Sequence, residues 1–92
     1  MESVMQTTKQ CLYCKTSYNL HSHHVFFGTA NRKLSEKRGL KVWLCMEHHT
    51  GSDGVHFNPE RDRRLKQAGQ MVYERKYGTR EDFIKEFGRS YL

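Results

Sequence analysis

Every cysteine and histidine of this 92-residue chain lies between positions 11 and 56, and this clustering strongly limits what the chain can fold into. The set comprises three cysteines and six histidines. An imidazole is costly to bury without a partner, and metal binding and proton transfer are the functions that bring several imidazoles together. The clustering therefore indicates a fold built around bound metal.

Two short motifs in this region have the spacing of a structural zinc site. Cys11 and Cys14 form a Cys-x-x-Cys pair, and Cys45 and His48 form a Cys-x-x-His pair further along the chain. Two thiolates at this spacing reach one tetrahedral ion from a tight turn. The sequence therefore predicts a structural Zn²⁺ bound by these four residues. The alternatives are a redox dithiol at the first pair, or cysteines that pack as small hydrophobic residues.

The composition favours one small domain with a thin core in a reducing compartment. Only 36% of the residues are hydrophobic, and domains of this size often add a metal or a disulfide. Three cysteines cannot all pair. No apolar run opens the chain as a signal peptide or approaches the ~18 residues of a membrane span. We expect a cytoplasmic protein whose cysteines bind metal.

The charge balance indicates a polyanionic partner. Lys and Arg outnumber Asp and Glu by 16 to 10, which gives a net charge of +6. A basic excess on a small domain favours nucleic acid as the partner. A basic surface without a specific partner is the alternative.

The patterning predicts a single α+β domain over residues 1–92, with a flexible lead-in over 1–9, a metal-binding core over 10–57 and a helical tail over 58–92. Strands are expected over 18–27 and 40–45, on either side of a short polar helix over 29–38 that ends at Gly39. In the tail, Asn58 and Thr79 are expected to cap two helices. The second helix has an apolar stripe of Phe83, Ile84, Phe87 and Tyr91.

Five histidines remain after His48 is assigned to zinc: His21, His23, His24, His49 and His56. A closed structural site has no use for them. His23 and His24 are adjacent, so on a strand they point to opposite faces. One of them can bind a metal while the other faces a substrate. His49 follows His48 and is expected to point away from the zinc, towards the strands.

The order of these parts resembles the HNH nucleases, whose active site is a ββα-metal unit with His-His on a first strand, a second strand and then Cys-x-x-His-His. The segment from His23 to His49 is most similar to small phage and prophage HNH proteins of the recombination-enhancement type, which act with a recombinase filament. The resemblance covers residues 11–56 closely and the tail more loosely. It implies a metal-dependent DNA endonuclease of a bacterial host's cytoplasm, leaving 5′-phosphate and 3′-hydroxyl ends.

Carried over residue by residue, the resemblance implies that His24 is the general base that activates water. His23 and His49 would bind the catalytic divalent cation, either Mg²⁺ or a transition metal, which polarises the scissile phosphate. The third ligand is either Asp53 or His56. We favour His56, because the glycines at positions 51 and 54 predict a loop that interrupts the helix needed to bring Asp53 into place.

Two further features complete the comparison with the family. The middle Asn of the family would fall near Gly39 or Leu40, and neither is Asn; Asn31 is the nearest. His21 is expected to support the site or to lie on the surface. The basic residues between the strands are the expected phosphate contacts, which position DNA without reading its sequence: Arg32, Lys33, Lys37, Arg38 and Lys41.

Two other functions stay open. The chain would serve as a zinc-stabilised nucleic-acid- or protein-binding module without cleavage, or as an HNH fold that inhibits another machine. The histidines outside the zinc motif distinguish these functions, because a binding module does not need them. Besides DNA, the candidate partners are a recombinase filament or another phage or host DNA-processing protein, with the chain a monomer or a homodimer.

Overall fold

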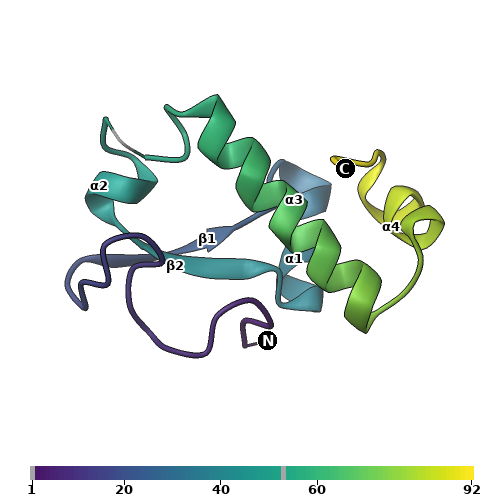
Figure 1. Cartoon of the computed structure of the whole chain (residues 1–92), viewed down its shortest axis with the longest axis horizontal. Helices are drawn as coiled ribbons and strands as arrows, with labels where there is room; N and C mark the ends of the chain where they lie inside the picture. The colour runs from purple at the N-terminus through teal and green to yellow at the C-terminus, as the bar shows by residue number, and fades with distance from the viewer. Residues whose placement is uncertain (1, 53) are drawn as a thin grey trace.

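The computed structural model describes residues 2–52 and 54–92. In chain order its elements are β1 (Leu20–His24), α1 (Thr29–Arg38), β2 (Lys41–Cys45), α2 (Met46–His49), α3 (Pro59–Lys76) and α4 (Arg80–Phe87). The two strands form an antiparallel sheet. Figure 1 shows this sheet in the middle of the molecule, with α3 crossing in front of it and α4 at one end. The predicted α+β class is confirmed.

Strand β2 begins and ends close to the predicted positions, whereas β1 covers only the middle of the predicted strand over 18–27. After His24 the Val25 N–H donates to the Leu40 carbonyl, just before β2, at 3.0 Å, and Phe26 then bonds to α1 instead. The Ser35 hydroxyl donates to the Phe26 carbonyl at 2.8 Å and accepts from the Phe26 N–H at 3.1 Å. Because these backbone groups are buried they need partners, and Ser35 supplies them. Val25 and Phe26 therefore enter the core as an irregular segment.

Helix α1 has the predicted bounds, and the predicted stop at Gly39 is confirmed. Gly39 has a φ of 70°, in the left-handed region that favours glycine. The position is also crowded, because a Cβ there would lie 2.4 Å from the carbonyl oxygen of Glu2. Gly39 thus lets the chain turn directly from α1 into β2.

The two C-terminal helices begin at the predicted caps. The Asn58 side chain accepts from the Arg61 N–H at 3.0 Å, and Thr79 and Asp82 form a reciprocal capping box. The core lies where these helices meet the segment after β1. The Phe26 ring contacts Phe83 and Phe87 of α4 at centroid distances of 5.2 Å and 4.8 Å.

Residues 2–10 form no helix or strand but contact the outer edge of β2. The Val4 N–H donates to the Gly39 carbonyl at 2.9 Å, and the Gln6 side chain accepts from the Trp43 N–H at 2.8 Å. Figure 1 shows this segment passing beside β2. It satisfies part of an edge that would otherwise be open to pairing with another chain.

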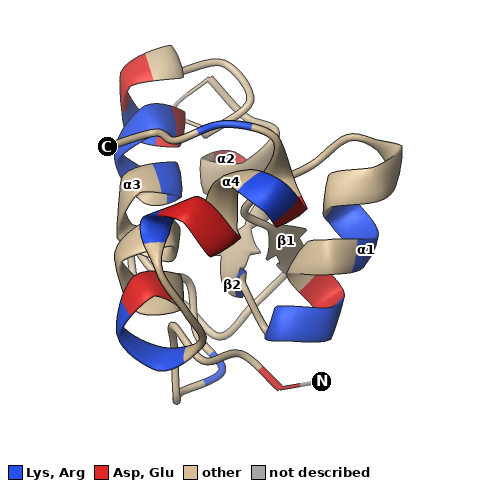
Figure 2. Ribbon diagram, turned by 90° about the vertical axis from the view of Figure 1, so that its right-hand side faces the viewer, with Lys and Arg blue, Asp and Glu red and all other residues tan. Residues whose placement is uncertain are grey.

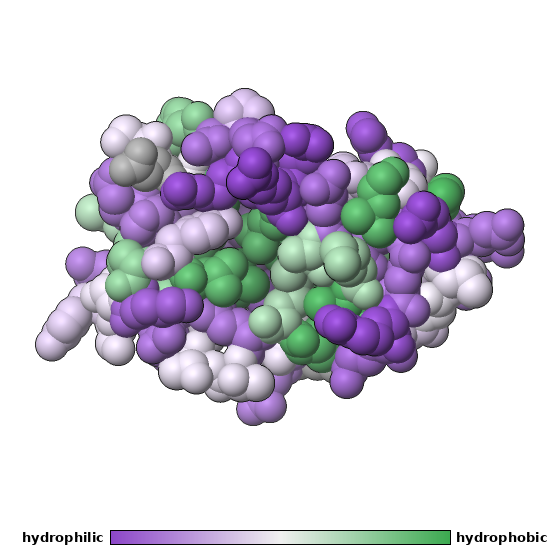
Figure 3. Space-filling model, viewed as in Figure 1, coloured by the Kyte–Doolittle hydropathy of each residue, from purple (hydrophilic) through white to green (hydrophobic). Residues whose placement is uncertain are grey.

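Charged side chains are spread over the helices, and Figure 2 shows basic and acidic residues alternating along α3 and clustered basic residues on α1. Figure 3 shows one face of the molecule as mainly hydrophilic, with hydrophobic side chains gathered along its middle. Within the part of the chain that the structure describes, no helix has the length and apolar character needed to cross a membrane.

Candidate metal centres

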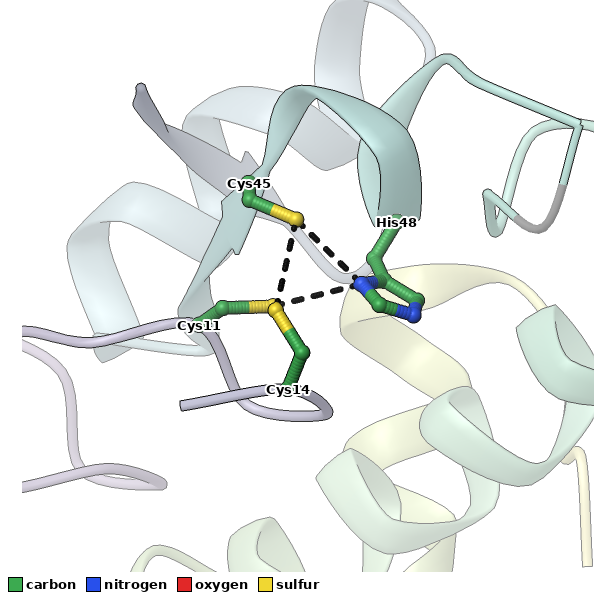
Figure 4. A group of neighbouring side chains, drawn as sticks. All are labelled: Cys11, Cys14, Cys45 and His48. Atoms are coloured by element: carbon green, nitrogen blue, oxygen red, sulfur yellow. Dashed lines mark hydrogen bonds between the residues drawn. The ribbon is translucent and has the colours of Figure 1, made fainter. Parts of the chain in front are cut away.

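The four predicted zinc ligands come together at one end of the sheet. Cys11 and Cys14 lie in the loop before β1, Cys45 ends β2 and His48 lies in α2. Their ligand atoms all lie within 4.8 Å of one another. Figure 4 shows the three sulfur atoms and the His48 ring facing one another.

The spacing of these atoms matches tetrahedral zinc coordination. Cys14 Sγ lies 3.7 Å from Cys45 Sγ, and Cys11 Sγ lies 3.6 Å from His48 Nδ1. Ligands at ~2.3 Å from a tetrahedral ion are separated by about 3.7 Å. The distance from Cys45 Sγ to His48 Nδ1 is shorter, at 3.2 Å. The cluster is therefore compatible with a structural zinc site bound through His48 Nδ1.

Backbone hydrogen bonds hold the first cysteine pair in place. The Leu12 N–H donates to the Trp43 carbonyl at 2.9 Å, which joins the loop to β2. The Cys11 N–H donates to the Thr16 carbonyl at 2.8 Å, and Lys15 takes a positive φ of 67° inside this turn. The turn aims both sulfur atoms at the end of β2.

The electrostatics of the thiols favour bound metal. Burial opposes ionisation of Cys11, but backbone hydrogen bonds from Cys14, Cys45 and Tyr13 outweigh it and lower the pKa of Cys11 to about 6. Burial, together with the neighbouring Cys14 and Cys11, raises the pKa of Cys45. Several thiolates this close repel one another unless a cation lies between them.

A second group, formed by His23, His49 and His56, lies apart from the cysteines. One ring nitrogen from each lies within 4.8 Å of the others. His49 Nε2 and His56 Nε2 are 3.2 Å apart, and the His23 ring centroid lies 5.2 Å from His49 and 5.3 Å from His56. The Val55 N–H donates to the His48 carbonyl at 3.0 Å, which folds the loop back and returns His56 to the strand.

The His23 side chain is buried without a hydrogen-bond partner. It is 2% exposed, and its Nε2 has no partner among residues 2–52 and 54–92. Burial and the nearby His49 and His56 lower the pKa of His23 to about 3, and burial and His56 also lower the pKa of His49. His23 and His49 therefore favour the neutral form, which has a lone pair available to a cation.

His21 contacts the back of this group. His21 Nδ1 lies 2.8 Å from His49 Nδ1, and the two rings meet edge to face. If the His49 Nε2 lone pair is kept for a cation, the ring proton lies on Nδ1, which then donates to His21. Metal-binding histidines commonly have such a partner, which fixes the tautomer and the ring orientation.

His24 lies on the opposite face of β1 from His23, as strand geometry predicts. Its Nε2 lies 2.9 Å from Glu36 Oε1, and Lys41 Nζ lies 2.8 Å and 3.1 Å from the two Glu36 oxygens. The hydrogen bonds from Lys41 and His24 hold the pKa of Glu36 well below its usual range. An ionised carboxylate only accepts, so His24 Nε2 carries the proton and Nδ1 is the basic nitrogen of the neutral ring.

The group of three histidines and His24 line one hollow of about 260 Å³. Its lining combines the three clustered imidazoles and His24 with Ser22, Phe27 and Arg32. Phe27 is 43% exposed, and Lys66 Nζ lies 4.1 Å from its ring centroid. The arrangement places three clustered imidazoles, His24 and the Arg32 side chain around one small space.

The five predicted DNA contacts are not equivalent. Arg32 lines the hollow, and Lys33 and Lys37 are exposed on α1. Arg38 instead makes two hydrogen bonds to Glu86, at 2.9 Å and 3.0 Å, and Lys41 bonds to Glu36.

Asn31 does not line the hollow, and nothing is assigned to Asp53. The Asn31 side chain donates to the Phe87 carbonyl at 3.4 Å, so it joins α1 to α4. Asp53 lies outside the described residues. Sequence reasoning missed Glu36 as a partner of His24; the signal for it was weak, since Glu36 is simply the one acidic residue of α1.

Comparison of the chain with family models, curated proteins and solved structures found no match. The class defined here is therefore a structural one: a small α+β protein with a Cys₃His cluster and a separate group of three histidines.

Proposed function

We propose that the protein is a metal-dependent DNA endonuclease of the HNH type, with a structural zinc at the Cys₃His cluster. The observation that carries the proposal is the buried, unpartnered Nε2 of His23, which faces His49 and His56 in the same hollow as His24.

A cation explains this arrangement better than a purely structural role does. Leaving a buried polar atom without a partner costs about 1–3 kcal/mol, and His23 Nε2 is such an atom, buried beside the rings of His49 and His56. A zinc-stabilised binding module needs Cys11, Cys14, Cys45 and His48 alone. It gives no reason to bury His23 against two further imidazoles.

The residues have distinct roles under this proposal. A divalent cation held by His23, His49 and His56 supplies Lewis acidity towards a phosphodiester and its leaving 3′ oxygen. His24 Nδ1 takes the proton from a water molecule, while Glu36 holds Nε2. The water oxygen then bonds to phosphorus as the bond to the 3′ oxygen breaks, and that oxygen gains a proton from solvent. The products carry 5′-phosphate and 3′-hydroxyl ends.

The surrounding residues fit a polyanionic substrate. Arg32 lines the same hollow as His24 and would contact a phosphate next to the cut. Lys33 and Lys37 are exposed on the same helix and extend this basic surface. The net charge of +6 adds a general attraction for nucleic acid.

The donor set favours a transition metal over Mg²⁺. Three imidazoles converge, whereas Mg²⁺ prefers oxygen ligands and keeps several waters. Mn²⁺, Ni²⁺, Co²⁺ and Zn²⁺ accept imidazole readily. We therefore expect the nuclease to be activated better by these ions than by Mg²⁺.

The cellular setting forms part of the same proposal. The chain would act on DNA in the cytoplasm of a bacterial host, in phage or prophage recombination, with a recombinase filament as a candidate loading partner.

The test is cleavage of supercoiled plasmid by the zinc-loaded chain with added Mg²⁺, Mn²⁺, Ni²⁺ or Zn²⁺. Removal of a general base lowers rates by about 10²–10⁴-fold, so His24→Ala should abolish most nicking while the zinc content and the melting curve stay unchanged. Lys85→Ala, an exposed change on α4, is the control for substitution itself.

Equal nicking by the parent and His24→Ala would contradict the assigned base. If neither protein cleaves naked plasmid or filament-coated DNA with any of these ions, the endonuclease proposal fails and the binding module takes its place.

A further inference from the structure

A second hollow, of about 390 Å³, lies on the outer face of the sheet and has no role in the proposed chemistry. It is formed by β2 residues Lys41 and Trp43, by Ser22 of β1, and by the segment that includes Gln6 and Lys9.

Trp43 provides an aromatic surface in this hollow. It pairs across the sheet with Ser22, which is exposed, so both side chains lie on the face away from the core. The Gln6 side chain accepts from the Trp43 N–H at 2.8 Å and fixes the backbone at this point. Trp43 is the one tryptophan of the chain.

An exposed lysine lies over the ring of Trp43. Lys9 Nζ lies 4.7 Å from the indole centroid, and Lys9 is exposed. A cation–π contact at an exposed site is worth only about 0.5–1 kcal/mol, so an incoming planar group displaces Lys9 at little cost. The freed ammonium then lies beside any phosphate that the planar group carries.

Ser22 connects this hollow to the candidate metal centre, because it lines both of them. The sheet register places the pair His24 and Lys41 next to the pair Ser22 and Trp43. A strand whose phosphate lies beside His24 therefore passes over Ser22 to reach Trp43.

The charges around the hollow suit a sugar–phosphate backbone. Lys9 and Lys41 line it, together with the acidic Glu2. Lys41 also forms an ion pair with Glu36. A basic groove with an aromatic ring is the arrangement that proteins use for single strands, because every base has a face that stacks. In a duplex both faces of a base are already covered.

We propose that the hollow between Trp43, Lys9 and Lys41 binds one unpaired nucleotide of the substrate strand, with its base stacked on Trp43. This inference rests on the proposed nuclease function, and it makes single-stranded or locally unpaired DNA the preferred substrate.

The test is a titration of the zinc-loaded full chain with oligothymidylate, without any other divalent cation. Trp43 fluorescence reports the hollow, and the anisotropy of a labelled oligonucleotide reports binding. We expect the fluorescence to fall in parallel with binding, and a duplex of equal length to bind more weakly. Trp43→Ala should weaken binding about 5- to 100-fold, the range for losing one base–aromatic stack, and Trp43→Phe should restore most of the affinity.

A charge reversal tests the hollow without touching the ring. Lys9→Glu should weaken binding to the single strand about 10-fold or more at low salt, whereas Lys85→Glu, the same charge change on α4, should have a much smaller effect. This pair keeps the proposal testable if Trp43→Ala fails to fold.

Three results would each overturn the proposal. The oligonucleotide binds without changing Trp43 fluorescence, it binds Lys9→Glu and Lys85→Glu equally, or it does not bind at all. None of these results decides the nuclease function, which plasmid nicking and His24→Ala test separately.

Discussion

Among single residues, what distinguishes the two candidate metal centres is the ring nitrogen that each histidine presents. His48 directs Nδ1 to the sulfur atoms, whereas its neighbour His49 directs Nε2 to His56 and Nδ1 to His21. Neighbouring residues of a helix point in different directions, so one turn of α2 serves both centres. The contact from His21 is then what holds His49 in the orientation that the second centre requires.

Replacing His21 tests this support. His21→Ala removes the acceptor for His49 Nδ1, and loss of such a partner typically lowers metal affinity 10- to 100-fold. Calorimetric titration of the zinc-loaded chain with Ni²⁺ measures the effect, and His21→Gln, which keeps an acceptor, should recover part of the affinity. Unchanged Ni²⁺ affinity in His21→Ala would show that His21 is only a neighbour.

Glu36 is expected to position His24. Glu36→Ala leaves His24 Nε2 without its carboxylate partner, so the orientation of the ring is no longer fixed. We expect kcat to fall about 10-fold or more while KM changes little, since small misplacements of catalytic groups are costly. Glu36→Gln, which still accepts a hydrogen bond, should retain more activity. A change confined to KM would assign Glu36 to substrate binding instead.

Among the helices and strands, boundaries that depend on adjacent residues could be predicted from the sequence. Boundaries that depend on contacts between distant residues could not. The caps at Asn58 and Thr79 and the stop at Gly39 depend on a few adjacent residues, and the predictions are confirmed. The early end of β1 depends on Ser35, which is nine residues from Phe26 along the chain. The bond from His24 to Glu36 likewise depends on packing that no local pattern encodes.

A partly buried contact joins three helices and makes their packing sensitive to pH. Glu86 of α4 accepts from Arg38 of α1 and from the Tyr73 hydroxyl of α3. Burial opposes the charge of Glu86, but these hydrogen bonds outweigh it and lower the pKa of Glu86. A lowered folded-state pKa stabilises the fold fully above the ordinary carboxyl pKa, and this stabilisation is lost progressively as the pH falls from there through the lowered folded-state pKa.

The expected result is that Glu86→Gln destabilises the protein at pH 7 by about 1 kcal/mol, a value reduced for partial exposure, and by less at lower pH. Urea unfolding of parent and variant from pH 7 to pH 4 measures the difference at each pH, which cancels contributions that both share. A constant difference across this range would mean that Glu86 acts through packing rather than through its charge.

In the molecule as a whole, few regular elements stabilise the part of the chain that contains the candidate metal centres. The sheet has two strands of five residues, and α2 has four residues. A two-stranded sheet is marginally stable by itself, and so short a helix does not form alone. The Cys₃His cluster joins the N-terminal loop, β2 and α2, so bound zinc would connect the parts that regular structure does not.

Zinc removal should therefore unfold the domain. Structural zinc contributes about 10–16 kcal/mol of apparent binding energy, while a whole domain has only ~5–15 kcal/mol of net stability. Cys14 is exposed, and at an ordinary exposed position Cys→Ser would change stability little. We expect Cys14→Ser to lose zinc and its cooperative melting transition, whereas Ser17→Ala, at a nearby exposed position, should melt like the parent. Circular dichroism with and without excess chelator measures this. Because His49 adjoins His48, Cys14→Ser should also lose Ni²⁺ binding at the histidine group in chelator-free buffer. A parent chain that melts unchanged in chelator would contradict the structural zinc.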